Sequence, residues 1–337
     1  MNELLTVKDL HVSIKSPQGK VEAVRGVNLE LRPGEVLAIV GESGCVKIML
    51  FKRIMMLLPK NAYIESGSIL ANGVDITLYK ERDMAKLRGR LFSMVFQDPM
   101  TSLDPTMTVG SQIAEAVLIH NPKMSKEEAY RRVIQLMELV GIPRPQERYK
   151  LYPYNFSGGM RQRTVMAIAL AGSPQILLAD EPTTALDVTI QAQILDLLRD
   201  IQQQLNTATI LVSHDLGVVA RAADRVAIMY AGRIVEIGTA EEVYYDPRHP
   251  YTWGLMRSLP ALARGKKALY TIPGMPPSLI DPPKGDAFAC RNEYALAVDY
   301  EEAPPMFPIT DTHYAATWLL DARVPKIESP LKGGSHV

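Results

Sequence analysis

Cysteine and an excess of either charge are the first things that this sequence lacks. Only two cysteines, Cys45 and Cys290, occur in 337 residues. So few thiols exclude a disulfide framework and fit a reducing compartment. The 37 Lys and Arg residues balance 37 Asp and Glu residues, so the surface gives no electrostatic reason to expect nucleic acid as a partner.

Long hydrophobic runs are absent as well. The most apolar stretches, such as residues 48–58 and 165–170, are short or interrupted by charge, and none reaches the roughly 20 residues of a membrane-spanning helix. The N-terminal sequence MNELLTVKDL has no basic segment followed by an apolar one, which predicts that there is no signal peptide. We therefore expect a soluble chain that reaches a membrane only through a partner.

What the sequence does contain is a regular alternation of strand and helix patterns. Alternating residues at 5–14 and 21–32, separated by a turn at 16–19, predict antiparallel strands at the N-terminus. Further strands are expected at 36–40, 175–179, 208–214 and 225–232, and helices between them at 47–58, 190–206 and 216–223. This order predicts an α/β fold with a mostly parallel sheet.

Two segments depart from that alternation. Residues from about 98 to 171 have mostly helical patterns, and they predict a helical subdomain inserted in the α/β core. After about residue 239, prolines cluster and helical periodicity fades, which predicts a loop-rich extension. We therefore divide the chain into a domain at 1–238 and a C-terminal extension at 239–337.

A candidate phosphate-binding loop follows the predicted strand at 36–40. The template for such loops is G-x-x-x-x-G-K-[ST], whose backbone N–H groups surround phosphates at the start of a helix. The corresponding residues here are Gly41, Glu42, Ser43, Gly44, Cys45, Val46, Lys47 and Ile48. The first glycine and the lysine match, and Lys47 would contact the outer phosphates of a nucleotide.

Two residues of this loop depart from the template. Val46 replaces the second glycine, and a glycine-like backbone conformation at this β-branched residue would cost on the order of 1–3 kcal/mol. Its side chain would also limit the approach of a phosphate. Ile48 replaces the Ser or Thr whose hydroxyl ligates Mg²⁺, and it has no oxygen to offer. Taken alone, the loop is also compatible with an ordinary strand–turn–helix unit.

A pair of carboxylates ends the apolar run at 176–179. Asp180 is placed to hold Mg²⁺, directly or through water, and Glu181 is placed to polarise an attacking water. An acidic residue after an apolar strand also occurs in α/β proteins of other functions. Two acids followed by Pro-Thr-Thr-Ala-Leu-Asp, which ends at Asp187, are far more specific.

Three further motifs lie at set places relative to this pair. Ser157, Gly158 and Gly159 open a helix and would present donors to an anion, although a simple capped helix has the same pattern. His214 follows the next strand, where it would contact a γ-phosphate, although a lone histidine there is more often structural. Gln97 ends a strand before the helical insertion, where a glutamine can sense Mg²⁺ or the attacking water.

These features, in this order, closely resemble the ATPase family of ATP-binding-cassette (ABC) transporters over about residues 4–238. The resemblance implies a P-loop NTPase (RecA-like) core that binds ATP and Mg²⁺. It also implies that residues 41–48 form Walker A and that Asp180 and Glu181 complete Walker B. The signature motif would begin with Ser157, Gly158 and Gly159. Gln97 would belong to the Q-loop, Asp187 to the D-loop, and His214 would be the switch histidine. Gln97 and Asp180 would then contact the metal, and Gln97, Glu181 and His214 would be catalytic.

The extension resembles the C-terminal region of oligopeptide and dipeptide importer ATPases, notably at residues 248–252 and 272–279. Several members of that family hold an iron–sulfur cluster there through four cysteines. The corresponding residues here are Asp286, Asn292, Asp299 and Thr317, and Cys290 is out of register. Because such a cluster needs four thiolates, we expect none.

The resemblance also implies partners. ABC ATPases work as head-to-tail dimers in which ATP lies between the Walker motifs of one subunit and the signature of the other. Peptide importers often pair two different ATPases, so we expect a heterodimer with a second ATPase, bound to two membrane permease subunits at the cytoplasmic face of the plasma membrane and served by a separate peptide-binding protein. The site built on this chain's own loop is expected to bind ATP weakly or hydrolyse it slowly, whereas its signature completes the partner's site.

Two other functions stay open. One is an ABC ATPase that acts on nucleic acid or ribosomes, but such proteins usually join two cassettes or carry a long coiled-coil insertion, and this sequence has neither. The other is a pseudo-ATPase that only scaffolds or regulates a partner. Val46 and Ile48 favour it, whereas the intact Glu181, Asp187 and His214 argue against it.

Overall fold

The computed structural model describes residues 3–42, 45–184, 186–259 and 270–331. The chain forms two compact units, and each is assembled from stretches that are far apart in sequence. The first unit comprises residues 1–4, 31–36 and 78–213, and the second comprises residues 5–30, 37–77 and 214–337. The domain boundary expected at residue 238 lies within the second unit and stays a prediction.

A parallel sheet forms the core of the first unit. β7 (Ile176–Asp180) lies between β6 (Phe92–Val95) and β8 (Ala208–Ser213). All residues of β7 and β8 are buried, as is typical of continuous apolar strands in a parallel sheet. α8 (Val188–Leu205) follows β7 and buries its apolar stripe. The strands and the helix expected in this part of the chain are confirmed.

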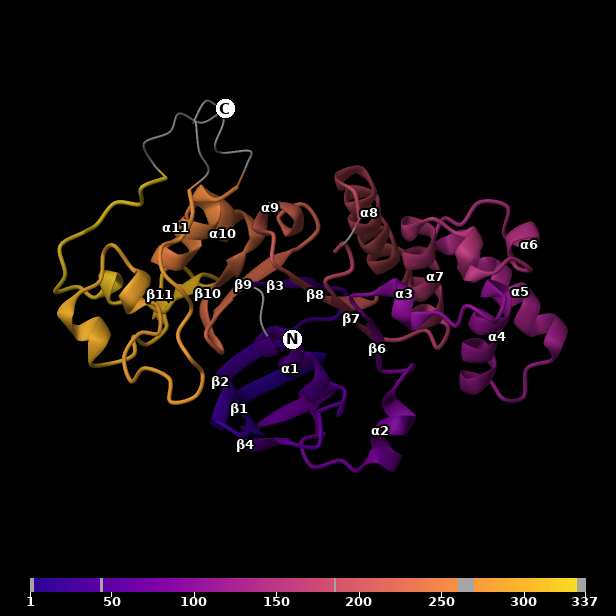
Figure 1. Cartoon of the computed structure of the whole chain (residues 1–337), viewed down its shortest axis with the longest axis horizontal. Helices are drawn as coiled ribbons and strands as arrows, with labels where there is room; N and C mark the ends of the chain where they lie inside the picture. Colours follow the sequence, from indigo (N-terminus) through magenta and orange to yellow (C-terminus); the bar gives the residue numbers. More distant parts are fainter. Residues whose placement is uncertain (1–2, 43–44, 185, 260–269, 332–337) are drawn as a thin grey trace. The chain divides into compact units, whose positions relative to one another are not determined.

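The remaining elements of the first unit are mostly helices (Figure 1). α2 (Glu81–Leu87) precedes β6, and the expected helical insertion follows it. The insertion consists of α3 (Pro99–Ser102), α4 (Val109–His120), α5 (Lys126–Leu139), α6 (Pro145–Arg148) and α7 (Gly158–Leu170). Ser125 and Glu128 exchange side-chain and backbone hydrogen bonds, so that a capping box starts α5.

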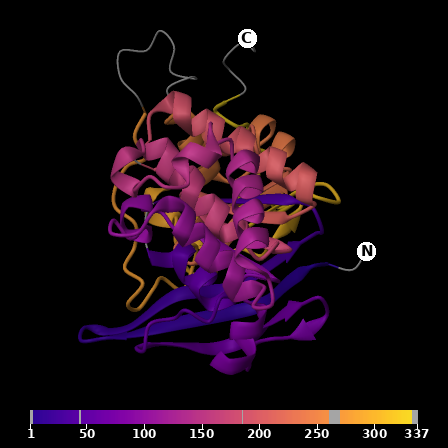
Figure 2. The ribbon, with the colours of Figure 1, turned by 90° about the vertical axis from the view of Figure 1, so that its right-hand side faces the viewer.

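An antiparallel sheet opens the second unit, as predicted. β1 (Leu5–Ser16), β2 (Gly19–Leu31), β4 (Ala62–Ala71) and β5 (Val74–Asp75) lie in the order β2-β1-β4-β5. Figure 2 shows β1 and β2 as a long hairpin across the lower part of the view. The sequence patterns did not predict β4, because polar residues and a glycine interrupt the apolar residues at the centre of its segment, AYIESGSILA.

A second sheet of this unit contains the predicted strand at 36–40. β3 (Val36–Val40) pairs in parallel with β9 (Arg225–Tyr230), and β10 (Arg233–Thr239) is antiparallel to β9. The short strands β12 (Tyr314–Ala315) and β11 (Phe307–Pro308) extend the sheet beyond β10. All five residues of β3 are buried, so the apolar run that precedes the candidate loop is a core strand.

Two helices of the second unit are shorter than predicted. α1 (Cys45–Ile54) ends before residue 58, because Met56 has a left-handed backbone with a φ of 52° that cannot continue the helix. α9 (Leu216–Val219) is a single turn. Among the helices of the residues described here, none combines the length and the apolar character needed to span a bilayer.

The extension after residue 239 is largely irregular, as expected. Its main helices are α10 (Ala240–Tyr245) and α11 (Pro250–Arg257). The fully buried carboxylate of Glu236, in β10, accepts hydrogen bonds from the Arg248 N–H, the Thr252 hydroxyl and the His313 ring. These bonds fasten the start of α11 and the β11–β12 hairpin to the sheet.

Candidate functional site

The predicted phosphate-binding loop joins β3 to α1. Gly41 directly follows β3, and a Cβ atom at this position would lie 2.1 Å from the Met229 carbonyl oxygen of β9. That close approach explains glycine at the first position of the loop. Lys47 is buried in the first turn of α1, and its ammonium donates to the Gly41 and Glu42 carbonyls over 2.5 and 2.9 Å.

The structure corrects one expectation about this loop. Val46 lies in α1, so its backbone is helical and does not adopt the glycine-like conformation that would strain it. The expectation for Ile48 is unchanged, because its half-buried side chain in the same turn has no oxygen for a cation. Ser43 and Gly44 lie outside the described residues, and only the backbones of Cys45 and Val46 are described.

Two side chains of the extension hold the second residue of the loop, and the sequence patterns missed both. The Glu42 N–H donates to the Tyr251 hydroxyl over 2.8 Å, and Arg291 donates to both Glu42 carboxylate oxygens over 2.9 Å. Burial lowers the pKa of Arg291, but its bonds to Glu42 and Tyr230 outweigh this effect and raise the pKa above the ordinary value. Burial raises the pKa of Tyr251. Arg291 is therefore held charged and Tyr251 neutral, the forms that bond Glu42.

The carboxylate pair lies at the carboxyl end of β7, in the first unit. Asp180 is 4% exposed. Glu181 has a left-handed φ of 43°, and its N–H donates to the Val212 carbonyl over 3.1 Å. The Gln97 amide and the Thr184 hydroxyl donate to one Glu181 carboxylate oxygen over 3.0 and 2.9 Å. The structure thus brings together Gln97 and Glu181, two of the residues predicted to be catalytic, at a strained backbone position of the kind found in functional sites.

The predicted anion-binding segment starts α7. Ser157 is the N-cap of the helix and accepts a hydrogen bond from the Met160 N–H. Ser157 and Gly158 are exposed, so their donors are open to a ligand. Gly159 is buried, and a Cβ atom there would lie 2.7 Å from Cγ2 of Ile190 in α8. Close packing between α7 and α8 therefore explains why residue 159 is glycine.

Other predicted site residues have contacts that leave their roles as predictions. Asp187 is the N-cap of α8, and its carboxylate accepts a hydrogen bond from the Ile190 N–H over 3.0 Å. His214 directly follows β8 and belongs to the second unit. In the described part of the chain, no three His, Cys, Asp or Glu side chains gather as a metal site. Metal binding by Asp180 and Gln97 also stays a prediction.

The four positions compared with cluster-binding cysteines carry buried polar side chains. Each accepts a hydrogen bond from a nearby backbone N–H, namely Asp286 from Phe288, Asn292 from Tyr294, Asp299 from Leu296 and Thr317 from Leu319. These bonds close local turns of the extension. Burial raises the pKa of Asp286 to about 6, while the Phe288 N–H opposes the rise and the neighbouring Asp299 charge adds to it.

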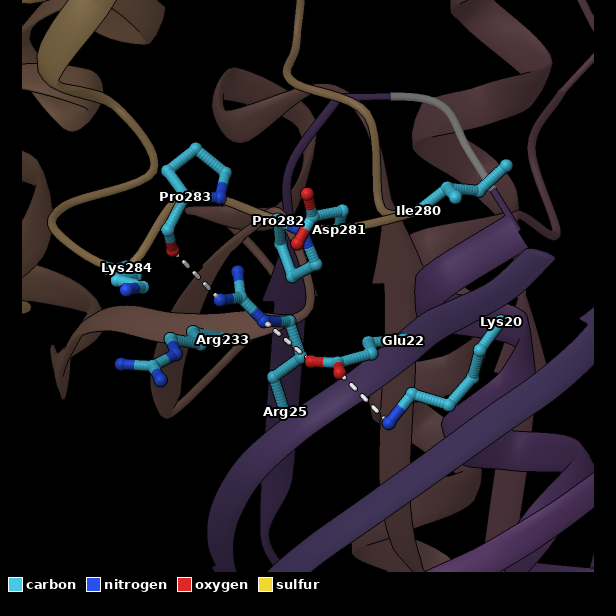
Figure 3. Close-up of a pocket in the computed structure, with 9 residues that line it drawn as sticks. All are labelled: Lys20, Glu22, Arg25, Arg233, Ile280, Asp281, Pro282, Pro283 and Lys284. Atoms are coloured by element: carbon cyan, nitrogen blue, oxygen red, sulfur yellow. Dashed lines mark hydrogen bonds and ion pairs between the residues drawn. The ribbon is translucent and has the colours of Figure 1, made fainter. Parts of the chain in front are cut away.

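A cavity of about 530 Å³ lies within the second unit, lined by charged side chains of β2 and β10 and by residues 280–284 (Figure 3). The Arg25 guanidinium lies between the Glu22 carboxylate, 3.7 Å away, and the Pro283 carbonyl, to which it donates over 3.3 Å. None of the residues predicted to bind nucleotide lines this cavity. The hydrogen bond between Arg25 and Pro283 attaches the extension to β2.

Solved structures of ATP-binding cassettes share the fold. The chain matches cbiO1 of Clostridium perfringens, part of the ABC transporter complex cbiONQ, with a TM-score of 0.64 and 29% identity over 73% of this chain and 92% of that chain. A dimeric ATP-binding cassette bound to ADP and phosphate matches with a TM-score of 0.62 and 24% identity over 70% of this chain and 98% of that chain. The predicted P-loop NTPase fold is therefore confirmed.

Two family descriptions match the sequence. "ABC transporter" matches residues 24–184, and "Oligopeptide/dipeptide transporter, C-terminal region" matches residues 235–297. The oligopeptide transport ATP-binding protein OppD of Bacillus subtilis is 56% identical over 98% of this chain and 92% of its own length. The dipeptide transport ATP-binding protein DppD of Lactococcus lactis is 54% identical over 96% of this chain and 93% of its own length. The chain is thus an ABC-type transport ATPase and belongs to the family of ATP-binding subunits of oligopeptide and dipeptide transporters.

Proposed function

We propose that this chain couples ATP hydrolysis to the uptake of oligopeptides or dipeptides and that its own nucleotide site is weakened. Ile48 supports this most directly, because the first turn of α1 has no hydroxyl where the loop template places one. Lys47 suits the role of phosphate ligand, since its ammonium already lies on the carbonyls of the loop. The Val46 side chain would narrow the approach of a phosphate.

The remaining ligands follow from the family's motifs. Residues 41–48 and Asp187 would contact ATP, and Asp180 and Gln97 would hold Mg²⁺ through oxygen atoms, the ligands that Mg²⁺ prefers. Bound Mg²⁺ would neutralise charge on the phosphates. Glu181 would orient the attacking water, and His214 would contact the γ-phosphate. Because only the hydroxyl at Ile48 is missing from this set, we expect slow turnover at this site rather than none.

The partners in this proposal are a second, different ATPase, two membrane permeases and a separate peptide-binding protein. The names of the relatives support a transporter of peptides, and the complex would lie at the cytoplasmic face of the plasma membrane. The exposed Ser157 and Gly158 at the start of α7 support the second nucleotide site, which this chain's signature would complete. No nucleic acid takes part, as the balanced charge suggests.

Restoring the loop tests the proposal. In the Val46→Gly, Ile48→Ser variant the affinity of the purified chain for labelled ATP should rise about tenfold or more with Mg²⁺ present, because a hydroxyl ligand and space for the phosphate return. The gain should shrink when EDTA removes the metal. The same changes made together with Lys47→Ala are the control and should give no gain. Unchanged ATP affinity in the restored loop would overturn the idea of a weakened site.

A pseudo-ATPase that scaffolds or regulates its partner is the second candidate, and Ile48 is again the observation that favours it. Glu181→Gln separates the two functions in the assembled transporter. A loss of part of the ATP turnover indicates hydrolysis at this chain's own site. Turnover unchanged by Glu181→Gln, with ATP still bound, indicates a scaffold.

We also propose that the extension binds no iron–sulfur cluster. Asp286, Asn292, Asp299 and Thr317 each use a side-chain oxygen to close a turn, and none supplies the thiolate that a cluster needs. Iron and acid-labile sulfide, measured on chain purified without oxygen, should both be absent. Stoichiometric amounts of both would contradict this proposal.

A further inference from the structure

We infer that Arg291 and Tyr251, both in the C-terminal extension, are positioning residues for the phosphate-binding loop. They act on Glu42, and through the Glu42 carbonyl on the ammonium of Lys47. The inference rests on the proposed function, because it takes Lys47 as the residue that meets the phosphates of ATP.

Every polar group of Glu42 is held by one of three side chains. Its N–H donates to the Tyr251 hydroxyl over 2.8 Å, and its carbonyl accepts from the Lys47 ammonium over 2.9 Å. Its carboxylate accepts two bonds of 2.9 Å from Arg291, the bidentate geometry that makes arginine–carboxylate pairs strong and directional. The extension therefore fixes the peptide group on which Lys47 rests.

The side chains that hold Glu42 are themselves fixed. Tyr251 is fully buried, and the Arg291 side chain is 5% exposed. Arg291 also donates to the hydroxyl of Tyr230 over 3.2 Å, and the Tyr230 ring centroid lies 4.6 Å from that of Tyr251 and 5.3 Å from that of Phe288. Tyr230 ends β9, which pairs with β3. This aromatic cluster is thus attached to the strand that leads into the loop.

Removal of the Arg291 side chain should disturb the conformation of the phosphate-binding loop more than the stability of the fold. The Glu42 side chain is 29% exposed, so a carboxylate without its partner would turn toward water rather than stay uncompensated. That movement would shift the Glu42 carbonyl and release the Lys47 ammonium from its position. We therefore expect weaker ATP binding and a more mobile loop, with the sheets intact.

A double-mutant cycle with Glu42→Ala, Arg291→Ala and the double variant tests this coupling. Arg291→Ala should raise the Kd for ATP about tenfold or more, and the double variant should resemble Glu42→Ala because the pair acts as one unit. Hydrogen exchange of the amides at 41–54 should be faster in Arg291→Ala. Arg291→Lys should recover only part of the affinity, since lysine cannot make the bidentate pair, and Tyr251→Phe should raise the Kd a few-fold.

The cycle is run in the native chain and in the Val46→Gly, Ile48→Ser background. Arg323→Ala is the matched control, because Arg323 makes a bidentate pair with Asp321 but its side chain is 84% exposed. It should change neither exchange at 41–54 nor ATP affinity. The inference is wrong if Arg291→Ala leaves the exchange unchanged or if the effects of Glu42→Ala and Arg291→Ala simply add. If only the native chain fails to bind ATP, that result counts against the proposed function. The inference is still tested in that case, because hydrogen exchange needs no nucleotide and because ATP affinity can be measured in the Val46→Gly, Ile48→Ser background.

Discussion

Asp286 links the folding of the extension to pH at the scale of a single residue. The side chain is buried beside Asp299 and accepts a hydrogen bond from the Phe288 N–H over 2.9 Å. Its pKa of about 6 lies above the ordinary value of 3.8. Between these values the folded chain keeps a proton that the unfolded chain has released, so stability falls as the pH rises through the window.

Asp286→Asn should therefore gain stability relative to the native chain as the pH rises from about 4 to about 7. The gain should be on the order of 3 kcal/mol, which is the free energy equivalent of the difference between the two pKa values. Asparagine has no charge to bury, and its side-chain oxygen can still accept from the Phe288 N–H. Urea unfolding at a series of pH values measures the difference.

Asp321→Asn is the control for this prediction. Hydrogen bonds from Arg323 lower the pKa of Asp321 to about 2, so its contribution to stability is lost only below about pH 4, as the pH falls through the folded pKa. The difference in unfolding free energy between Asp321→Asn and the native chain should stay constant from about pH 4 to about pH 7. A flat difference for Asp286→Asn as well would show that its carboxyl group is not buried as described.

Residues of the candidate site could be predicted from sequence where the chemistry has a fixed local spacing. Gly41 and Lys47 are two ends of one short loop, and Gln97 and Glu181 each follow a strand. Arg291 and Tyr251 could not be predicted, because they lie 249 and 209 residues from Glu42 and their contact is created by the tertiary fold. The helical backbone of Val46 could not be predicted either, because α1 starts at Cys45 whereas the sequence pattern predicts a helix from residue 47.

At the scale of elements, the packing of α7 on α8 depends on one glycine. Gly159→Ala should destabilise the chain by about 1–3 kcal/mol, because the new Cβ atom would lie 2.7 Å from Cγ2 of Ile190 and a β-branched side chain in a helix has few other rotamers. Urea unfolding measures the loss. Ile190→Ala in the same chain should recover part of it by removing the clashing methyl group.

Gly158→Ala is the matched control, one residue earlier in the same helix. Its Cβ atom would meet Cδ2 of Leu186 at 3.4 Å, which is ordinary contact, and alanine favours the helix over glycine. The variant should be as stable as the native chain or slightly more stable. Equal stability of both alanine variants would mean that α7 and α8 are not packed as closely as described.

Elements could be predicted where burial is uniform. β3 and β7 are buried on both faces, so each appears in the sequence as a continuous apolar run. β4 pairs with β1 along its whole length, but the residues at its centre, 65–67, are exposed. Pairing rather than sequence pattern therefore makes it a strand. α9 ends after one turn although its apolar pattern continues to residue 223, because tertiary context overrides local propensity.

At the scale of the whole molecule, the proposal of two unequal nucleotide sites predicts unequal effects of two substitutions. In the assembled transporter, Ser157→Ala of this chain should slow ATP turnover about tenfold or more, because it removes a donor from the partner's active site. Lys47→Ala should slow it much less, because it affects only the weakened site. Steady-state ATP hydrolysis in reconstituted membranes measures both.

Ser125→Ala is the control for lost helix capping. Ser125 and Ser157 both cap a helix in the first unit, and each cap contributes about 1 kcal/mol to stability. Ser125→Ala should lower the melting temperature to a similar extent without slowing turnover. Should Lys47→Ala slow turnover as strongly as Ser157→Ala, the two sites would have to be regarded as equal.

The way the second unit is assembled has a consequence for synthesis. β3 and the phosphate-binding loop are translated early, but β9 follows about 190 residues later, and Tyr251 and Arg291 lie 209 and 249 residues beyond Glu42. At about 5–20 residues per second the ribosome needs on the order of ten seconds or more to supply these supports. Until then β3 lacks one of its neighbours and the loop lacks its anchors. A nascent chain that stops before residue 291 would therefore carry every nucleotide motif while the first of them still lacked the arginine that holds it.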